Sequence, residues 1–336
     1  MENTDNRQNI TVQYCFPGYN SSCRKEVRTG PAYIFLFIVL SCVSVFTVFL
    51  NLLVIISISH FKQLHTPSNL LILSLAVADL LVGLFVMPVK IMQLMDSCWY
   101  LGKIACISSE IIVALSMSGS LFSFIFIAVD RYIAVSEPLL YSTRITVCKM
   151  SVSIVLGWSF CLLYIIIYYY FNDHLLQSQV PTECYGECVV FVKYSWVIVD
   201  LILFFLAPCS VILILYAIIF NVARHQAKAV RVIINITSHK VSSTSETKAT
   251  KTLGIVVFVY LACWIPYYVS SLSLESITTV SMGWTVFTWI LYINSSVNPL
   301  IYAIFYPWFR ESTKYIISCQ IFKPSSSRFK LLPEHF

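Results

Sequence analysis

The sequence predicts an all-α membrane protein, a bundle of seven transmembrane helices followed by a short amphipathic helix. Of its 336 residues, 58% are hydrophobic and only 11% are charged, which is far more apolar than a soluble domain. A helix that crosses a bilayer takes about 20 apolar residues. Seven runs in the chain are long enough: 33–59, 68–95, 104–135, 149–171, 192–221, 253–274 and 282–305.

The runs are continuous and lack the short alternating segments of a transmembrane β-barrel. Backbone hydrogen bonds must therefore form within each run, as they do in a helix. The runs divide the chain into an N-terminal tail (1–32), a seven-helix bundle (33–305) and a C-terminal segment (306–336) that opens with a basic amphipathic stretch. We expect that stretch to form a helix on the membrane surface, followed by a cytoplasmic tail.

Lysine and arginine residues mark the cytoplasmic side of a membrane protein. Here they concentrate in the segments that follow the first, third, fifth and seventh runs. We therefore expect a multi-pass protein of the plasma membrane with its N-terminus outside the cell. The net charge of +6 then fits contact with anionic membrane lipids rather than with nucleic acid.

The expected outer side carries sequence signals of its own. Two Asn-X-Ser/Thr sequons predict N-glycosylation of the tail at Asn9 and Asn20. Six of the twelve cysteines fall on this side, where oxidising conditions favour disulfides: Cys15, Cys23, Cys98, Cys106, Cys184 and Cys188. Their spacing alone does not choose among the possible pairings.

The polar residues inside the runs form a pattern that resembles the rhodopsin-like G-protein-coupled receptors. The marks are, in chain order, Asn51, LAVAD ending at Asp79, Asp130-Arg131-Tyr132, Trp158, Pro208, Tyr216, CWIP at 263–266 and NPLIY at 298–302. All of them occur in order over nearly the whole chain. The resemblance implies a receptor fold whose partner is a heterotrimeric G protein.

A finer resemblance is to the trace amine-associated receptors. It rests on NSSVNPLIYAIFYPWF (294–309), HFKQLHTPSN (60–69) and DSCWYLG (96–102). Ser296 replaces the usual threonine of that fingerprint, and Leu50 replaces the usual glycine before Asn51. The resemblance implies a small amine ligand, a role in olfaction and a stimulatory G protein that raises cyclic AMP.

The same resemblance implies two disulfides on the outer side. One joins Cys106 to Cys188, and the other joins Cys23 to Cys184. Cys15 is the alternative partner of Cys184.

Five short polar side chains are expected to meet in the middle of the bundle: Asp79, Ser120, Asn294, Ser295 and Asn298. Such a cluster suits a sodium ion. It suits equally well a water-bridged hydrogen-bond network without an ion.

Opposite charges are expected at the same depth on the cytoplasmic side, because Arg131 lies near the end of the third run and Glu246 begins the sixth span, ahead of its apolar run. An ion pair between Arg131 and Glu246 would hold these two ends together, and breaking it would open a crevice for a G protein, as in the resembled family. The resemblance also assigns activation roles to four further residues: Asp130, Tyr132, Tyr216 and Tyr302.

One aspartate, Asp200, interrupts the fifth run, eight residues before Pro208. Amine receptors normally carry their ammonium-binding aspartate in the third helix, at the position that Val113 occupies here. The acidic residue therefore lies on the other side of the expected pocket, on the fifth helix rather than the third. This arrangement resembles some fish members of the family. A buried carboxylate needs a partner, and we interpret Asp200 as the counter-ion of a ligand ammonium because intramembrane acids are usually functional.

A second acid, Glu110, lies one turn outward of Val113, and two acids would suit a diamine. However, Lys90 lies at similar depth and could neutralise Glu110, which favours a ligand with one ammonium. Six further residues are expected to line the pocket with aromatic, apolar or hydroxyl groups: Met117, Trp264, Tyr267, Tyr268, Thr288 and Tyr292.

Other classes of function fit less well. No phosphate-binding loop, paired metal-ligand motif or nucleophile elbow occurs in the sequence, so neither an enzyme nor a metal site other than the sodium candidate is expected. A light receptor would need a lysine where Tyr292 stands, and a transporter would show inverted repeats. The nearer alternatives are a diamine receptor that uses Glu110 together with Asp200, and a receptor for a non-amine ligand in which Asp200 is structural.

Overall fold

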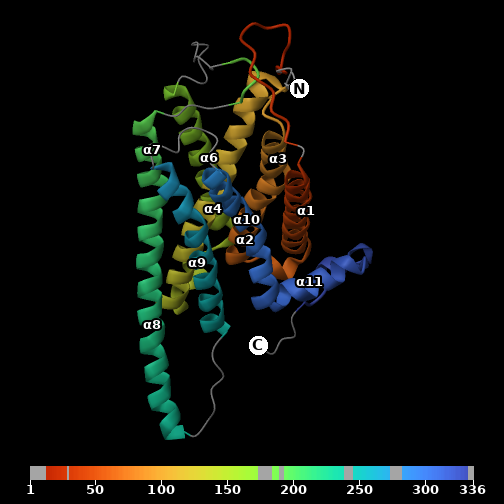
Figure 1. The fold of residues 1–336 in the computed structure, drawn as a ribbon. Helices are drawn as coiled ribbons and strands as arrows, with labels where there is room; N and C mark the ends of the chain where they lie inside the picture. The colour runs from red at the N-terminus through yellow and green to blue at the C-terminus, as the bar shows by residue number, and fades with distance from the viewer. Residues whose placement is uncertain are drawn as a thin grey trace, which may run out of the picture.

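A computed structural model describes residues 13–28, 30–172, 184–188, 193–237, 245–272 and 282–331. Side chains are described for all of these except 226–237, 245–253, 257 and 282–284. Within the described residues, helices are the regular elements, and strand pairing is limited to isolated bridges near the N-terminus. Figure 1 shows the helices side by side in one bundle, with residues 13–28 over one end and α11 across the other.

The first three predicted runs become long helices. They are α1 (Pro31–His60), then α2 (Pro67–Leu81) with α3 (Met87–Met95), and α4 (Gly102–Ser136). A π-helical turn, Val82–Val86, joins α2 to α3. The turn precedes Pro88, which has no backbone N–H to continue regular pairing. Ser44 of α1 satisfies a carbonyl there by donating to Gly83 O at 2.7 Å.

The fifth span also contains a π-helical turn. It consists of α7 (Tyr194–Leu201), a π-helical turn at Ile202–Leu206, and α8 (Ala207–Thr237). The turn again lies just before a proline, Pro208. One residue added to a helical turn rotates the preceding segment by about 100° relative to the rest. The face that α7 presents to the bundle is therefore set by this turn.

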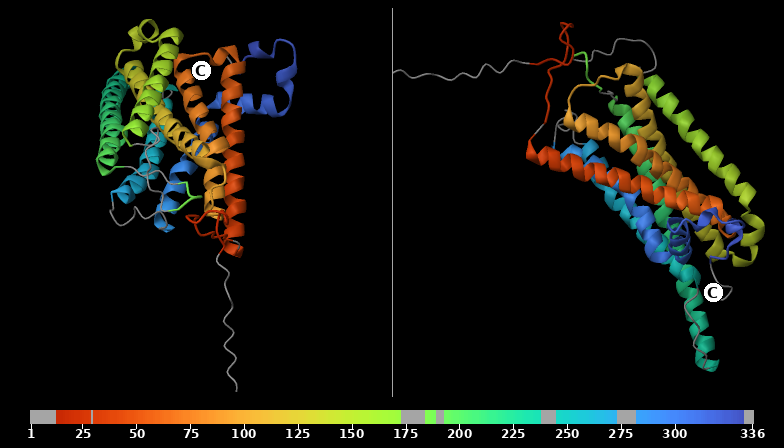
Figure 2. Two further views of the ribbon diagram at one scale, coloured as in Figure 1. Left: turned by 90° about the horizontal axis from the view of Figure 1, so that it is seen from above. Right: turned by 90° about the vertical axis from the view of Figure 1, so that its right-hand side faces the viewer.

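The remaining elements complete the bundle. They are α5 (Pro138–Arg144), α6 (Val147–Phe171), α9 (Ser245–Ser271), α10 (Met282–Phe305) and α11 (Pro307–Ile317). In both figures α8 reaches well beyond the other long helices at the end that carries α11 (Figures 1 and 2).

Six of the described helical segments are long and apolar enough to cross a membrane: Pro31–His60, Pro67–Met95, Gly102–Ser136, Val147–Phe171, Tyr194–His225 and Gly254–Ser271. They correspond to the first six predicted runs. The seventh run forms α10, which packs against α9 and α1.

Three helices are joined tightly in the middle of the bundle. The indole of Trp158 on α6 donates to Ser74 on α2 at 3.0 Å, and Ser74 shares a further 3.0 Å hydrogen bond with Ser123 on α4. Gly119 on α4 makes room for the indole, because a Cβ at that position would lie 2.9 Å from the ring of Trp158. We call α2, α4 and α6, so joined, the three-helix block.

The end of the bundle that carries residues 13–28 is held by three disulfides, Cys15–Cys98, Cys23–Cys184 and Cys106–Cys188, and we call it the disulfide end. At the opposite end the chain returns after α11. There the backbone N–H of Leu331 donates to the Gln63 side chain at 2.9 Å, and Ser326 contacts His60 at 3.0 Å.

Candidate functional site

A cavity of about 1010 Å³ extends from the disulfide end into the bundle. A mostly apolar cavity with a few charged groups is typical of a small-molecule site. The structure brings together in its walls all nine residues that the sequence analysis assigned to a ligand: Glu110, Val113, Met117, Asp200, Trp264, Tyr267, Tyr268, Thr288 and Tyr292.

Asp200 reaches this cavity from α7, directly before the π-helical turn. Within the described part of the chain its carboxylate accepts one hydrogen bond, from the Tyr268 hydroxyl at 3.4 Å, and forms no ion pair. The nearby Lys193 donates its ammonium proton to Phe171 O at 2.7 Å. Asp200 thus retains acceptor capacity that faces the cavity.

Aromatic rings pack around the hydroxyl that contacts Asp200. Tyr268 stacks on Trp264 at a centroid distance of 5.8 Å, meets Tyr267 edge-on at 5.4 Å and lies 4.6 Å from Phe205. Tyr268 is only 4% exposed. The carboxylate is therefore set among π faces, which stabilise a cation held beside it.

Glu110 forms an ion pair inside the same cavity. The ammonium of Lys90 on α3 lies 2.6 Å from the Glu110 carboxylate on α4. The side chains are 22% and 21% exposed. The structure therefore confirms that Lys90 can neutralise Glu110, whereas Val113, one turn inward, contributes only apolar surface.

A fully buried acid, Asp79, lies deeper in the bundle. Asn298 donates to its carboxylate at 2.9 Å, and Ser120 donates at 3.4 Å. Asn294 and Ser295 are buried as well. The Ser295 side chain also hydrogen-bonds to the Asp79 carboxylate, and its carbonyl accepts from the Asn51 side chain at 3.1 Å.

The Asp79 cluster has the chemistry that a hard cation requires. The side-chain oxygens of Asn294 and Asn298 are buried and lack a hydrogen-bond partner among the described residues. Carboxylate, hydroxyl and amide oxygens are the ligands that hard cations take in proteins. The residues present therefore fit a sodium ion, and they fit bridging waters equally well.

At the opposite end of the bundle, Asp130 accepts hydrogen bonds from three residues. Ser68 donates to it at 2.8 Å and Tyr141 at 2.7 Å, and Arg131 pairs with it through both Nε, at 3.0 Å, and Nη2. Burial raises the pKa of the Tyr141 hydroxyl above its ordinary value. The phenol therefore stays protonated and donates.

The expected ion pair between Arg131 and Glu246 stays a prediction, because the Glu246 side chain lies outside the described residues. The other activation candidates belong to the same half of the molecule. Tyr302 is 2% exposed and packs edge-on against Tyr306 at 5.9 Å. The Tyr216 hydroxyl is buried without a hydrogen-bond partner in the described structure, and Tyr132 is half-buried.

Comparison with known proteins decides the family. Residues 50–302 match the family described as 7 transmembrane receptor (rhodopsin family). The chain belongs to this family. Receptors of this kind are multi-pass membrane proteins and not enzymes, and their partners are a small-molecule ligand and a G protein.

Full-length relatives place the receptor among the trace amine-associated receptors. It is 40% identical to trace amine-associated receptor 6 of Pan troglodytes, with 97% of each chain covered. It is 39% identical to trace amine-associated receptor 13c of Danio rerio, covering 95% of this chain and 96% of the relative. It is also 39% identical to trace amine-associated receptor 8b of Rattus norvegicus, covering 98% and 100%.

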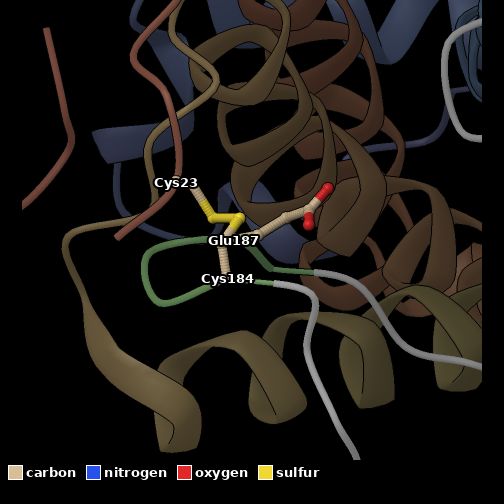
Figure 3. A group of neighbouring side chains, drawn as sticks. All are labelled: Cys23, Cys184 and Glu187. Carbon is tan, nitrogen blue, oxygen red and sulfur yellow. A yellow bond between two sulfur atoms is a disulfide. The ribbon is translucent and has the colours of Figure 1, made fainter. Parts of the chain in front are cut away.

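The disulfides of the receptor include both pairs that the family resemblance implied. The alternative in which Cys15 pairs with Cys184 is wrong, because Cys15 bonds to Cys98. Figure 3 shows Glu187 beside the Cys23–Cys184 bond. These three side chains lie within metal-ligand distance of one another, but sulfurs joined in a disulfide offer no thiolate to a metal.

Of the two predicted glycosylation sites, Asn20 is exposed, and Asn9 lies outside the described residues.

Two kinds of site residue were not predicted from the sequence. Tyr164 and Tyr168 of α6 line the cavity, and their spacing of four residues on one helix face was an available signal. Ser68 and Tyr141, which donate to Asp130, had none, because Ser68 is distant from it in sequence and Tyr141 lies on a separate helix, α5.

Proposed function

We propose that the receptor senses small amines with one ammonium group and that Asp200 is the counter-ion of that group. The proposal rests on what the Asp200 carboxylate contacts. It lines the cavity, accepts a single long hydrogen bond, and has no cationic partner among the described residues. The relatives named for trace amines support the same reading.

An unpaired carboxylate in a low-dielectric cavity is costly, and an ammonium ion offsets that cost. Faces of Tyr268, Tyr267 and Trp264 add stabilisation of roughly 0.5 to 2 kcal/mol where a cation lies over a ring. Apolar groups such as Val113 and Met117 line the same cavity. An amine with an apolar or aromatic body therefore fits better than a catechol.

The remaining parts of the proposal concern topology and signalling. α10 is the seventh membrane span, α11 lies on the inner membrane surface, and the disulfide end faces outside the plasma membrane. The G protein binds at the opposite end, near Arg131 and Glu246, and is of the stimulatory type that raises cyclic AMP. A role in olfaction is part of the proposal, because the resemblance of the sequence to trace amine-associated receptors implies it. A sodium ion occupies the Asp79 cluster.

The test is a cyclic-AMP reporter assay in cells that express the parent receptor or Asp200→Asn. The panel contains primary, tertiary and cyclic amines with an uncharged analogue of each. Glu187→Gln is the matched control, because Glu187 is an exposed acid that lines the mouth of the same cavity. All variants are measured at equal surface expression.

We expect amines to activate the parent and the control, uncharged analogues to be silent, and Asp200→Asn to lose the response. Loss of an ion pair inside such a cavity typically costs about 3 to 5 kcal/mol, which is at least a hundredfold in potency. A response of Asp200→Asn equal to that of the parent contradicts the proposal. The acid would then be structural, and the receptor would take a non-amine ligand or use Glu110.

A further inference from the structure

The cavity contains a second acid, Glu110, whose carboxylate already forms an ion pair. Glu110 on α4 and Lys90 on α3 both line it, and their charged atoms are 2.6 Å apart. Each side chain is about a fifth exposed, so the pair faces the cavity space rather than bulk water or the core. A ligand that fills the cavity therefore meets an ammonium and a carboxylate that compensate each other.

The charges along the cavity can be divided into two levels. At the mouth lie Arg28, Asp96 and Glu187, and Asp96 is paired with Lys25 at 3.7 Å. Deeper inside lie Lys90, Glu110 and Asp200. With Lys90 and Glu110 neutralising each other, the described residues of the inner level carry only the net charge of Asp200. One ammonium balances it.

We propose that Lys90 sets the charge that the receptor accepts in a ligand. By binding Glu110 it removes the acid that a second ammonium would need, and its own charge repels that ammonium. The inference rests on the proposed function and adds to it the rejection of diamines. Specificity of this kind needs a repulsive element as well as an attractive one, and Lys90 is that element.

The position of Lys90 follows from the local fold. It lies on the first turn of α3, just after the π-helical turn at Val82–Val86 and after Pro88. The turn rotates α3 relative to α2, so that Lys90 meets α4 instead of continuing the face of α2. A merely structural ion pair would join α3 to α4 in the same way, and the experiment must separate the two roles.

The experiment compares unbranched α,ω-diamines with monoamines of the same chain lengths on four receptors. These are the parent, Lys90→Gln, Glu110→Gln, and the charge swap that combines Lys90→Glu with Glu110→Lys. Potencies are read by cyclic AMP at matched surface expression. The swap keeps the ion pair and the net charge, so it separates charge from packing.

For the parent we expect diamines to be at least about tenfold weaker than the matching monoamines. Lys90→Gln frees Glu110, which attracts any ammonium, so we expect diamine potency to improve at least about tenfold more than monoamine potency, a difference of about 1.4 kcal/mol. Glu110→Gln leaves Lys90 uncompensated and weakens both classes. The charge swap restores the preference of the parent.

Two results overturn the inference while leaving the proposed function intact. One is a parent that responds to diamines as well as to monoamines, which requires no variant to fold. The other is a Lys90→Gln receptor that reaches the surface, answers monoamines and gains nothing with diamines. A parent that ignores every amine refutes the proposed function itself, and the inference with it.

Discussion

The hydroxyl of Tyr268 lies 3.4 Å from a carboxylate oxygen of Asp200 and joins α9 to α7 across the cavity. The ring that carries this hydroxyl is held between Trp264 and Tyr267. The direction of the Asp200 carboxylate thus depends on an aromatic cluster in another helix. A ligand that binds Asp200 acts on both helices at once.

Replacing Tyr268 with phenylalanine removes the hydrogen bond and keeps the ring. Because the bond is long, we expect a loss of about 1 kcal/mol, or roughly fivefold in amine potency. Tyr164→Phe is the control, since Tyr164 lines the same cavity and its buried hydroxyl has no hydrogen-bond partner among the described residues. Equal potencies of the two variants in a dose-response assay would show that the bond does not position Asp200.

The Asp79 cluster predicts a sodium effect on stability. An ion that binds only the folded receptor raises its stability as the ion concentration rises. Exchanging potassium chloride for sodium chloride at constant ionic strength should therefore raise the melting temperature of the ligand-free receptor in detergent. Asp79→Asn should abolish the shift and Asp200→Asn should retain it. An unchanged shift in Asp79→Asn would favour the network of waters.

The contact between Gly119 and Trp158 leaves no space for a side chain at position 119. A methyl group there would lie 2.9 Å from the indole, and overpacking of this kind typically costs about 1 to 3 kcal/mol. We expect Gly119→Ala to lower the melting temperature and the surface level. Gly254→Ala is the control, because a Cβ at that helical position meets nothing within 4 Å; alanine there should stabilise the helix by roughly 0.5 to 1 kcal/mol. Similar behaviour of both variants would argue against close packing at Gly119.

The Cys15–Cys98 bond can be tested chemically. Peptide mapping without reduction should yield this pair together with the two other disulfides. Replacing both Cys15 and Cys98 with serine should destabilise the receptor by about 2 to 5 kcal/mol, the usual loss for a native disulfide. Cys161→Ala, at a buried free cysteine, serves as a comparison that leaves every bridge intact. Recovery of Cys15 in a peptide with Cys184 would contradict the structure.

The sequence predicted most of the bundle because long apolar runs reflect the thickness of the membrane. The apolar runs do not predict the ends of helices that continue beyond the membrane into water. The fifth run was expected to end at 221, yet α8 continues to Thr237. The sixth apolar run starts at 253, whereas α9 begins at Ser245 and so includes Glu246, the residue expected at the start of this span. Hydropathy detects where a helix leaves hydrocarbon, whereas its end depends on backbone hydrogen bonds, which polar residues also allow.

The candidate site was predictable where the family motifs indicate how far along its helix each residue lies. That position alone predicted that Asp200 and Glu110 would line the cavity. The direction of Asp200 also depends on the π-helical turn at Ile202–Leu206, which spacing does not reveal, since Pro208 indicated only a kink. Ser68, which donates to Asp130, and Cys98, which bonds to Cys15, come from distant segments, and one sequence contains no information on which of several candidates will meet.

The three-helix block has a practical consequence for watching the receptor work. Hydrogen bonds among Ser74, Ser123 and Trp158 fix α2, α4 and α6 to one another, whereas Asp200 and Tyr268 lie on α7 and α9, outside the block. A pair of spectroscopic labels within the block should report a constant distance whatever ligand is added. A pair that spans from the block to α9 is the one to choose for recording the structural response to an amine.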